Sequence, residues 1–157
     1  MKELNVHPNY LIAYREAIRV FLIIAGRELI DELDRLIDDL KNPRYIYDTT
    51  GAYERIDFME NCVRLTKAPF YNKPMKLMLW QKAFIEVVYS FKMADTGFER
   101  FKKIVLLIAR KNTKSETCSA LALTELIIGE PGNDIVCSSN DDNQASIVYD
   151  AVCYTHL

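Results

Sequence analysis

Six consecutive apolar residues, Ile104 to Ala109, interrupt a chain in which apolar positions otherwise recur mostly at helical intervals. An apolar run of this length with β-branched members is typical of a strand buried on both faces of a parallel sheet. Polar residues follow it, and apolar residues then recur at helical spacing as far as Ile127. The pattern therefore predicts a strand, a short loop and a helix that begins with Lys114 and Ser115.

A long amphipathic helix is predicted for the first part of the chain. Apolar residues recur at steps of three and four from Tyr14 to Leu40, and Asn42-Pro43 ends the pattern. We expect one helix or two in line, weakened in the middle by Gly26. An apolar stripe of this length must pack against another surface. That surface would belong either to its own domain or to a partner, including a second copy of the chain.

Three further helices are expected, over residues 53–63, 77–91 and 142–154, from helical spacing or from a capping pair before the first turn. A second buried strand is predicted over residues 134–137. Together with the run that starts at Ile104 and the helix between them, this strand gives a right-handed parallel βαβ unit.

The turn-rich residues 41–51 are the best candidate for a linker. The expected fold is therefore α/β, with a helical N-terminal arm over residues 1–50 and a core with parallel strands over residues 51–157. At 157 residues, the chain is long enough to bury a sizeable core.

Charge is unevenly distributed along the chain, although the net charge is only −2. Between Glu99 and Glu116, six Lys or Arg residues stand against two Glu residues, a local excess of +4 around the predicted loop. Such a patch attracts nucleotides or nucleic acids, or is simply a solvated rim. The four Cys residues show no metal-binding spacing, and neither a signal peptide nor a membrane-spanning apolar run is present. We therefore expect reduced thiols in a soluble, cytoplasmic protein.

The loop before Lys114 has the spacing of a phosphate-binding loop. In the pattern G-x-x-x-x-G-K-[ST], loop amides and the start of a helix surround a polyphosphate, Lys reaches the β- and γ-phosphates, and the Ser or Thr hydroxyl ligates magnesium. Aligned on Lys114 and Ser115, the pattern places Ile108 and Thr113 where the two glycines would stand. The spacing indicates a nucleotide site, whereas the missing glycines also fit an ordinary helix start.

Four motifs follow one another in the second half of the chain. They are Leu79-Trp80-Gln81, then Arg100-Phe101-Lys102-Lys103, then Ala109-Arg110-Lys111-Asn112-Thr113-Lys114-Ser115, and finally Cys137-Ser138-Ser139 with Gln144-Ala145. Together they resemble the large terminase subunit of tailed bacteriophages, an ATP-driven motor that packages DNA into an empty capsid. The resemblance spans about residues 50–155. It implies a partial P-loop nucleotide-binding core.

The resemblance also implies roles for individual residues. Trp80 and Gln81 match the motif that contacts adenine, and the Gln amide would read the base edge with one donor and one acceptor. Arg110 matches the loop arginine that stabilises the γ-phosphate, which makes it the implied catalytic residue. Ser115 would ligate Mg²⁺. The implied ATP-binding residues are Trp80, Gln81, Arg110, Lys111, Asn112, Thr113, Lys114 and Ser115. In the plainer alternative, Trp80 is a helix core residue and the loop charges are solvated.

ATP and Mg²⁺ are therefore the implied ligands. In a complete motor, the implied partners are double-stranded DNA, a small terminase subunit and a portal, in the cytoplasm of a bacterial host and without a membrane. The acidic pair that holds magnesium and polarises water has no counterpart in the sequence, nor has the nuclease domain. We thus expect the core to be truncated before the acidic strand and the isolated chain to be inactive in hydrolysis. The alternative is a catalytically inactive prophage remnant or a helical protein-interaction module.

Overall fold

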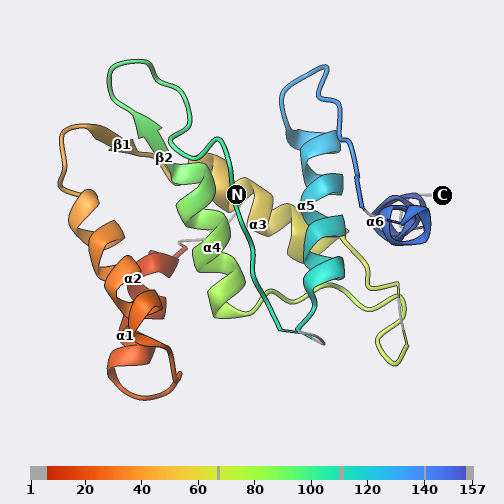
Figure 1. Cartoon of the computed structure of the whole chain (residues 1–157), viewed down its shortest axis with the longest axis horizontal. Coiled ribbons are helices and arrows are strands. Elements are labelled where there is room, and N and C mark those ends of the chain that lie inside the picture. Colours follow the sequence, from red (N-terminus) through yellow and green to blue (C-terminus); the bar gives the residue numbers. More distant parts are fainter. Residues whose placement is uncertain (1–6, 67, 110–111, 140, 155–157) are drawn as a thin grey trace, which may run out of the picture. The chain divides into compact units, whose positions relative to one another are not determined.

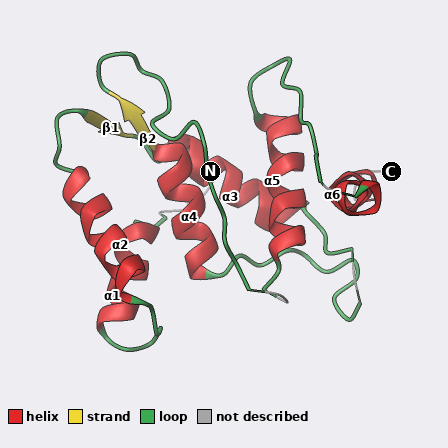
Figure 2. Ribbon diagram, in the orientation of Figure 1, coloured by secondary structure: helices red, strands yellow, loops and turns green. Residues whose placement is uncertain are grey.

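The computed structural model describes residues 7–66, 68–109, 112–139 and 141–154. Within these residues the fold is mostly helical, with a small two-stranded antiparallel sheet (Figure 1, Figure 2). None of the described helices is long and apolar enough to cross a membrane. The elements in chain order are α1 (Tyr10–Arg19), α2 (Arg27–Asp39), β1 (Tyr45–Tyr47), α3 (Thr50–Cys62), α4 (Leu79–Ser90), β2 (Phe91–Met93), α5 (Lys114–Ile128) and α6 (Asp142–Tyr154).

The chain divides into two compact units. The first holds Met1–Ile56 and Leu77–Ile104, and the second holds Asp57–Lys76 and Val105–Leu157. Helix α3 contributes to both units. The boundary expected near residue 50, between a helical arm and a core, stays a prediction.

The first two helices fold back on each other, so the prediction of one helix or two in line is wrong (Figure 1). Arg15 in α1 binds Asp34 in α2 with an Nε to Oδ1 distance of 2.6 Å. The two residues are 19 positions apart, a separation of about 28 Å along a continuous helix. A reversal of the chain between α1 and α2 is therefore required.

A left-handed residue at the end of α1 produces this reversal. Phe21 has a φ of 59°. Its N–H donates to the carbonyl of Ile18 at 3.1 Å, and the N–H of Leu22 donates to the carbonyl of Ala17 at 2.9 Å. These two bonds are those of a Schellman motif, where glycine usually takes the left-handed position. Because phenylalanine stands there instead, the sequence pattern does not reveal the turn.

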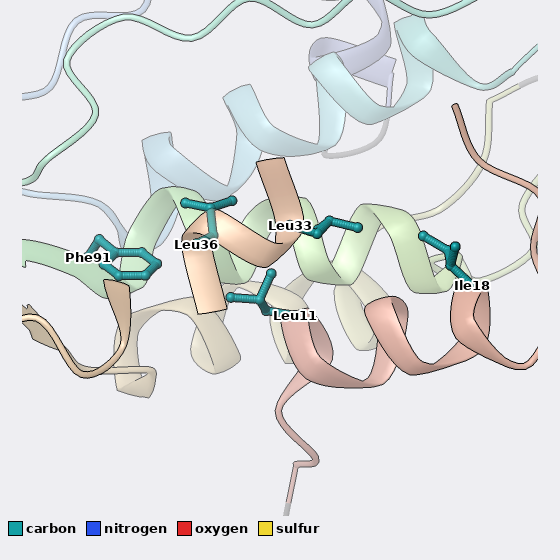
Figure 3. Packing of buried hydrophobic residues seen from close by; sticks show 5 residues of the cluster. All are labelled: Leu11, Ile18, Leu33, Leu36 and Phe91. Carbon is teal, nitrogen blue, oxygen red and sulfur yellow. The ribbon is translucent and has the colours of Figure 1, made fainter. Parts of the chain in front are cut away.

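Buried apolar side chains from α1, α2 and β2 form the core of the first unit (Figure 3). Val87 of α4 and the β1 residues Tyr45 and Tyr47 pack against this core. The apolar stripe of the first two helices is thus covered only in part within its own unit, at Ile18, Leu33 and Leu36. Its members Phe21, Leu22 and Leu29 are 89%, 80% and 40% exposed. The core residues are Leu11, Ile18, Leu33, Leu36 and Phe91.

Two short strands, which the sequence pattern does not predict, complete the first unit. β1 lies inside residues 41–51, the segment expected to be a linker. Three residues between turn formers are too few to show the alternation of a strand. β2 follows directly on α4, and its first residue, Phe91, is the last residue of the segment expected to be helical. The antiparallel register pairs Tyr45 with Met93, Ile46 with Lys92 and Tyr47 with Phe91.

The parallel strand pair predicted from the sequence is not found in the described chain. Residues 104–109 and 134–137 have no strand pairing, and Figure 2 draws both as loops. Val105, Leu107 and Val136 are 91%, 96% and 86% exposed. A buried strand needs hydrogen-bonded neighbours and layers on both faces, and the described residues supply neither to these segments. The apolar pattern therefore overestimates their burial.

Helices α5 and α6 in the second unit begin where the sequence predicts, at Lys114 and Asp142. They pack against each other. Thr117 and Thr124 of α5 are fully buried, and their hydroxyls donate to carbonyls four residues earlier at 2.8 and 2.6 Å. Buried hydroxyls that bond back to the helix carry no unsatisfied donor into the interior.

Candidate nucleotide-binding site

The Trp-Gln motif occupies the first turn of α4. Met78 is the N-cap, and its N–H donates to Oε1 of Gln81 at 2.7 Å. Gln81 is only 1% exposed. This bond uses one of the two lone pairs of the amide oxygen and fixes the orientation of the carboxamide relative to the helix start.

Trp80 lies beside this cap and is partly exposed. Its indole N–H donates to the sulfur of Met78 at 3.4 Å. Partial burial of Trp80 fits a helix core residue, the plainer alternative, as well as a base contact. The partly exposed Trp80 ring offers a surface on which a nucleobase could stack, whereas the Gln81 amide beside it is buried.

Glu86, which sequence analysis missed, holds α4 in place. Its carboxylate has no exposed surface and accepts the Tyr10 N–H at 2.8 Å, the Leu11 N–H at 3.1 Å and the Tyr47 hydroxyl at 2.5 Å. Burial, together with this carboxylate, raises the pKa of the Tyr47 hydroxyl. The available sequence signal was a single acidic residue within the apolar run Ala83–Val88.

The predicted phosphate loop ends in an unusual backbone conformation. Thr113, the N-cap of α5, is left-handed with φ 56° and ψ 22°. The N-caps of α1, α2 and α4, which are Asn9, Gly26 and Met78, all have extended backbone. Extended backbone is the usual state of an N-cap. Thr113 therefore differs from an ordinary helix start, at the position where the phosphate-loop pattern has its second glycine.

The start of α5 presents groups that suit an anion. The N-cap Thr113 makes no side-chain cap hydrogen bond to the first amides of the helix, and these amides form its positive end. The carbonyl of Thr113 accepts the Thr117 N–H at 2.9 Å and the Thr117 hydroxyl at 2.8 Å. Lys114 is exposed. Within the described residues, the Lys114 ammonium makes no ion pair and the Ser115 hydroxyl makes no hydrogen bond.

The predicted site residues belong to two different units. Trp80 and Gln81 lie in the first unit, and Asn112 to Ser115 lie in the second. Asn112 is exposed, next to Thr113. Arg110 and Lys111, the other loop residues, lie outside the described residues.

Ser115 is the predicted magnesium ligand. In a nucleotide complex, Mg²⁺ takes most of its ligands from phosphate oxygens and water, so a single hydroxyl next to Lys114 fits what the loop would contribute. The described residues contain no group of three or more His, Cys, Asp or Glu side chains that could hold a metal. The fit to magnesium therefore depends on the nucleotide that accompanies the ion.

Arg100, in the second motif, is held by an ion pair and by aromatic rings. Its Nη2 atom lies 2.7 Å from Oδ2 of Asp39, and the two side chains are 10% and 15% exposed. The guanidinium also lies 4.0, 5.1 and 5.0 Å from the ring centroids of Tyr45, Phe91 and Phe101. This motif thus ties the segment after β2 to α2 and β1.

Comparison with known proteins agrees with the motifs. Residues 79–154 match the family model described as terminase large subunit, ATPase domain. The matched segment runs from the first residue of α4 to the last residue of α6 and contains both the Trp-Gln pair and the Lys-Ser pair. The resemblance inferred from the sequence is confirmed over this segment. No curated protein and no solved structure matches the chain.

Proposed function

We propose that this chain binds ATP with magnesium for a DNA-packaging motor, because residues 79–154 match the model of the terminase large subunit ATPase domain. The family implies nucleotide binding. The finer assignment, ATP held by a phosphate loop without glycines, is our proposal. In an assembled motor its partners would be double-stranded DNA, a small terminase subunit and a portal.

The observation that carries the proposal is the left-handed backbone of Thr113 directly before Lys114. Glycine is usual before the lysine of a phosphate loop, because the backbone comes close to the phosphates there. An ordinary helix start has no need of this conformation. The left-handed conformation of this β-branched residue supports a loop of phosphate-binding shape, although the glycine of the pattern is absent.

The proposal assigns a role to each predicted ATP-binding residue. The amides at the start of α5 and the Lys114 ammonium neutralise charge on the β- and γ-phosphates. Trp80 stacks on adenine, and the Gln81 amide bonds to its edge. Arg110 would stabilise charge on the γ-phosphate, and Lys111, Asn112 and Thr113 would line the loop. Magnesium, when bound, neutralises charge between the two outer phosphates, and Ser115 would contribute one ligand.

The mechanism these residues serve is phosphoryl transfer to water. Catalysis in that reaction consists mainly of positioning and charge stabilisation. Lys114 and the helix amides would bind and orient the triphosphate. Arg110 would stabilise the charge on the γ-phosphate. ATP recognition is therefore the part of the reaction assigned to this chain.

Calorimetric titration with ATP and magnesium tests the proposal. We expect measurable binding by the wild type, none by Lys114→Ala, and wild-type affinity in Lys76→Ala. Lys76 is an exposed lysine of the same unit and serves as the control. Equal affinities in all three proteins, or no binding by the wild type, would overturn the proposal in favour of a helical protein-interaction module.

A further inference from the structure

The chain between α3 and α4 forms a hairpin over residues 63–75, which contains none of the predicted site residues (Figure 1). It also precedes the family match, which begins at residue 79. Between Glu60 and Glu86 the sequence holds five Lys or Arg residues and no Asp or Glu. Because the whole chain has a net charge of −2, this stretch is a local concentration of positive charge. The five cationic residues are Arg64, Lys67, Lys73, Lys76 and Lys82, of which Lys67 lies outside the described residues.

Backbone hydrogen bonds join the two arms of the hairpin. The Met75 N–H donates to the Val63 carbonyl at 3.0 Å, and the Leu65 N–H donates to the Lys73 carbonyl at 2.9 Å. Val63 and Met75 are only 5% and 3% exposed, so apolar packing fixes the base. At the tip, the Lys73 N–H donates to the Phe70 carbonyl at 3.0 Å, which closes a turn of four residues. The base of the hairpin is therefore anchored and its tip is a closed turn.

Two aromatic side chains are exposed in this turn. Phe70 and Tyr71 are 55% and 72% exposed, so much of the surface of both residues is available to a ligand. The Lys73 ammonium lies 5.5 Å from the centroid of the Phe70 ring, within the range of a cation–π contact. Aromatic surface and positive charge thus lie side by side at the tip.

The cations of the two arms have no carboxylate partner. Arg64 and Lys73 are both exposed, and within the described chain neither makes an ion pair. An antiparallel bridge pairs Arg64 with Pro74, the residue after Lys73, so the two charges stand on adjacent arms. Exposed cations without counter-ions attract a ligand that carries several negative charges.

We propose that the hairpin binds single-stranded nucleic acid. Arg64 and Lys73 neutralise backbone phosphates, and unpaired bases stack on Phe70 and Tyr71. Cations combined with exposed aromatic rings hold a single strand without sequence preference, since every base has a face that stacks. The bases of a duplex are already stacked on one another, so a duplex engages the cations alone.

Two further points define the proposal. All four residues belong to the second unit, and none is part of the proposed nucleotide site, so the inference does not depend on ATP binding. An anionic membrane also attracts cationic and aromatic side chains. The hairpin, however, lacks the continuous apolar face with which amphipathic segments enter a membrane surface, so a nucleic acid is the better match.

Fluorescence anisotropy of the full chain with labelled oligo-dT of about 20 nucleotides, longer than a typical single-strand site, tests the proposal without any nucleotide. We expect Phe70→Leu with Tyr71→Leu to raise the Kd about tenfold. This variant keeps every charge, so the salt dependence of the Kd should not change. Arg64→Gln with Lys73→Gln should also raise the Kd. It should reduce the slope of log Kd against log salt concentration by about 1.4, because each lost phosphate contact accounts for about 0.7.

Two variants outside the hairpin serve as matched controls. Lys41→Gln with Arg44→Gln removes two exposed charges, and Tyr149→Leu removes a ring of α6 that is 65% exposed. Both should bind oligo-dT like the wild type. A duplex of the same length is the second ligand, and the Phe70 and Tyr71 variant should bind it with wild-type affinity. Circular dichroism shows whether each variant is folded.

Three results would overturn the proposal. The first is no binding of oligo-dT by the wild type at low ionic strength. The second is a wild-type Kd in both hairpin variants, which would place any binding elsewhere on the chain. The third is an equal loss for single strand and duplex in the Phe70 and Tyr71 variant, because the rings would then support the hairpin without stacking on bases. Phosphatidylserine vesicles test the membrane alternative. Vesicle binding that both hairpin variants lose, with unchanged DNA binding, would assign the hairpin to a membrane surface instead.

Discussion

Phe21 and Thr113 adopt a backbone conformation that L-residues other than Asn and Asp rarely visit, with φ of 59° and 56°. Phe21 follows the last turn of α1, and Thr113 precedes the first turn of α5. Strained backbone of this kind persists where the surrounding structure requires it. For Phe21 the requirement is the reversal between α1 and α2. For Thr113 the proposed requirement is the phosphate loop.

Thr113→Gly is expected to stabilise the folded chain. Thr113 is left-handed in the folded chain, so its strain belongs to the folded state itself. Relief of the strain, less the entropy that glycine adds to the unfolded chain, should raise the free energy of unfolding by about 1 kcal/mol. Urea denaturation measures this difference. Asn112→Gly is the control, since it adds a glycine at the neighbouring loop position without relieving the strain at Thr113.

The effect of Thr113→Gly on ATP binding should be smaller. Strain present in both the free and the bound chain cancels in the Kd, so only crowding of the phosphates by the threonine side chain is relieved. We expect the Kd to fall by less than about tenfold. A fall of about a hundredfold with unchanged stability would contradict this account, because the strain would then arise only on binding.

Single residues show most clearly what could and could not be predicted from the sequence. Lys114 begins its helix as predicted, because its spacing from the apolar run is a local pattern. Phe21 and Glu86 were not predicted. The conformation of Phe21 depends on the packing of α1 against α2, and the partners of Glu86 are 75 and 76 positions away for the backbone amides and 39 for Tyr47. Contacts at such separations leave no trace in local periodicity.

The elements of the first unit are joined by a nearly buried ion pair. Asp39 at the end of α2 contacts Arg100, and Nη1 of Arg35 lies 3.3 Å from the same carboxylate oxygen. Burial pushes the pKa of Asp39 up, but hydrogen bonds from Arg100 and Asn42 outweigh it and hold the pKa below its ordinary value. Nη1 of Arg100 has no hydrogen-bond partner in the described chain. Asp39 is thus the carboxylate that compensates the nearly buried Arg100 guanidinium.

Asp39→Asn should lower the free energy of unfolding by about 1–3 kcal/mol at pH 7, because it leaves a nearly buried guanidinium without its carboxylate. Asp38→Asn, at the exposed neighbouring position, is the matched control. Urea denaturation of the three proteins at two pH values measures both the cost and its pH dependence.

The sign of the pH dependence follows from the lowered pKa of Asp39. A carboxyl with a folded pKa below its unfolded pKa contributes stability that is complete above about pH 4 and is lost as the pH falls through the folded pKa. The difference between the wild type and Asp39→Asn should therefore shrink in acid. A difference of the same size at pH 7 and about pH 3 would show that Asp39 acts through packing and not through its charge.

At the scale of elements, the positions of the later helices could be predicted, whereas the reversal between α1 and α2 and the two strands could not. α3, α5 and α6 lie where spacing or capping residues predict them, because helical signals repeat every turn within one segment. β1 has three residues, and β2 continues α4 without a turn. A strand is defined by its partner as much as by its own residues, and the partner of β1 is more than 40 positions away.

At the scale of the whole molecule, the apolar pattern and the structure disagree about residues 104–109 and 134–137. The pattern predicts a buried parallel pair, whereas the structure leaves both segments unpaired, with Val105, Leu107 and Val136 exposed. The match to the family model over residues 79–154 does not decide between these states for the free chain. Hydrogen bonding does, because backbone amides in a central strand are protected and unpaired amides are not.

Native-state hydrogen exchange of the free chain should therefore separate the two architectures. We expect amides of residues 104–109 and 134–137 to exchange at nearly the rate of an unfolded peptide, because no strand pairing protects them. Amides of α5 between Thr117 and Ile128 should be protected and serve as the internal reference, since their helical bonds must open first. Residues 104–109 protected as strongly as α5 would instead establish the parallel strand that the sequence predicts.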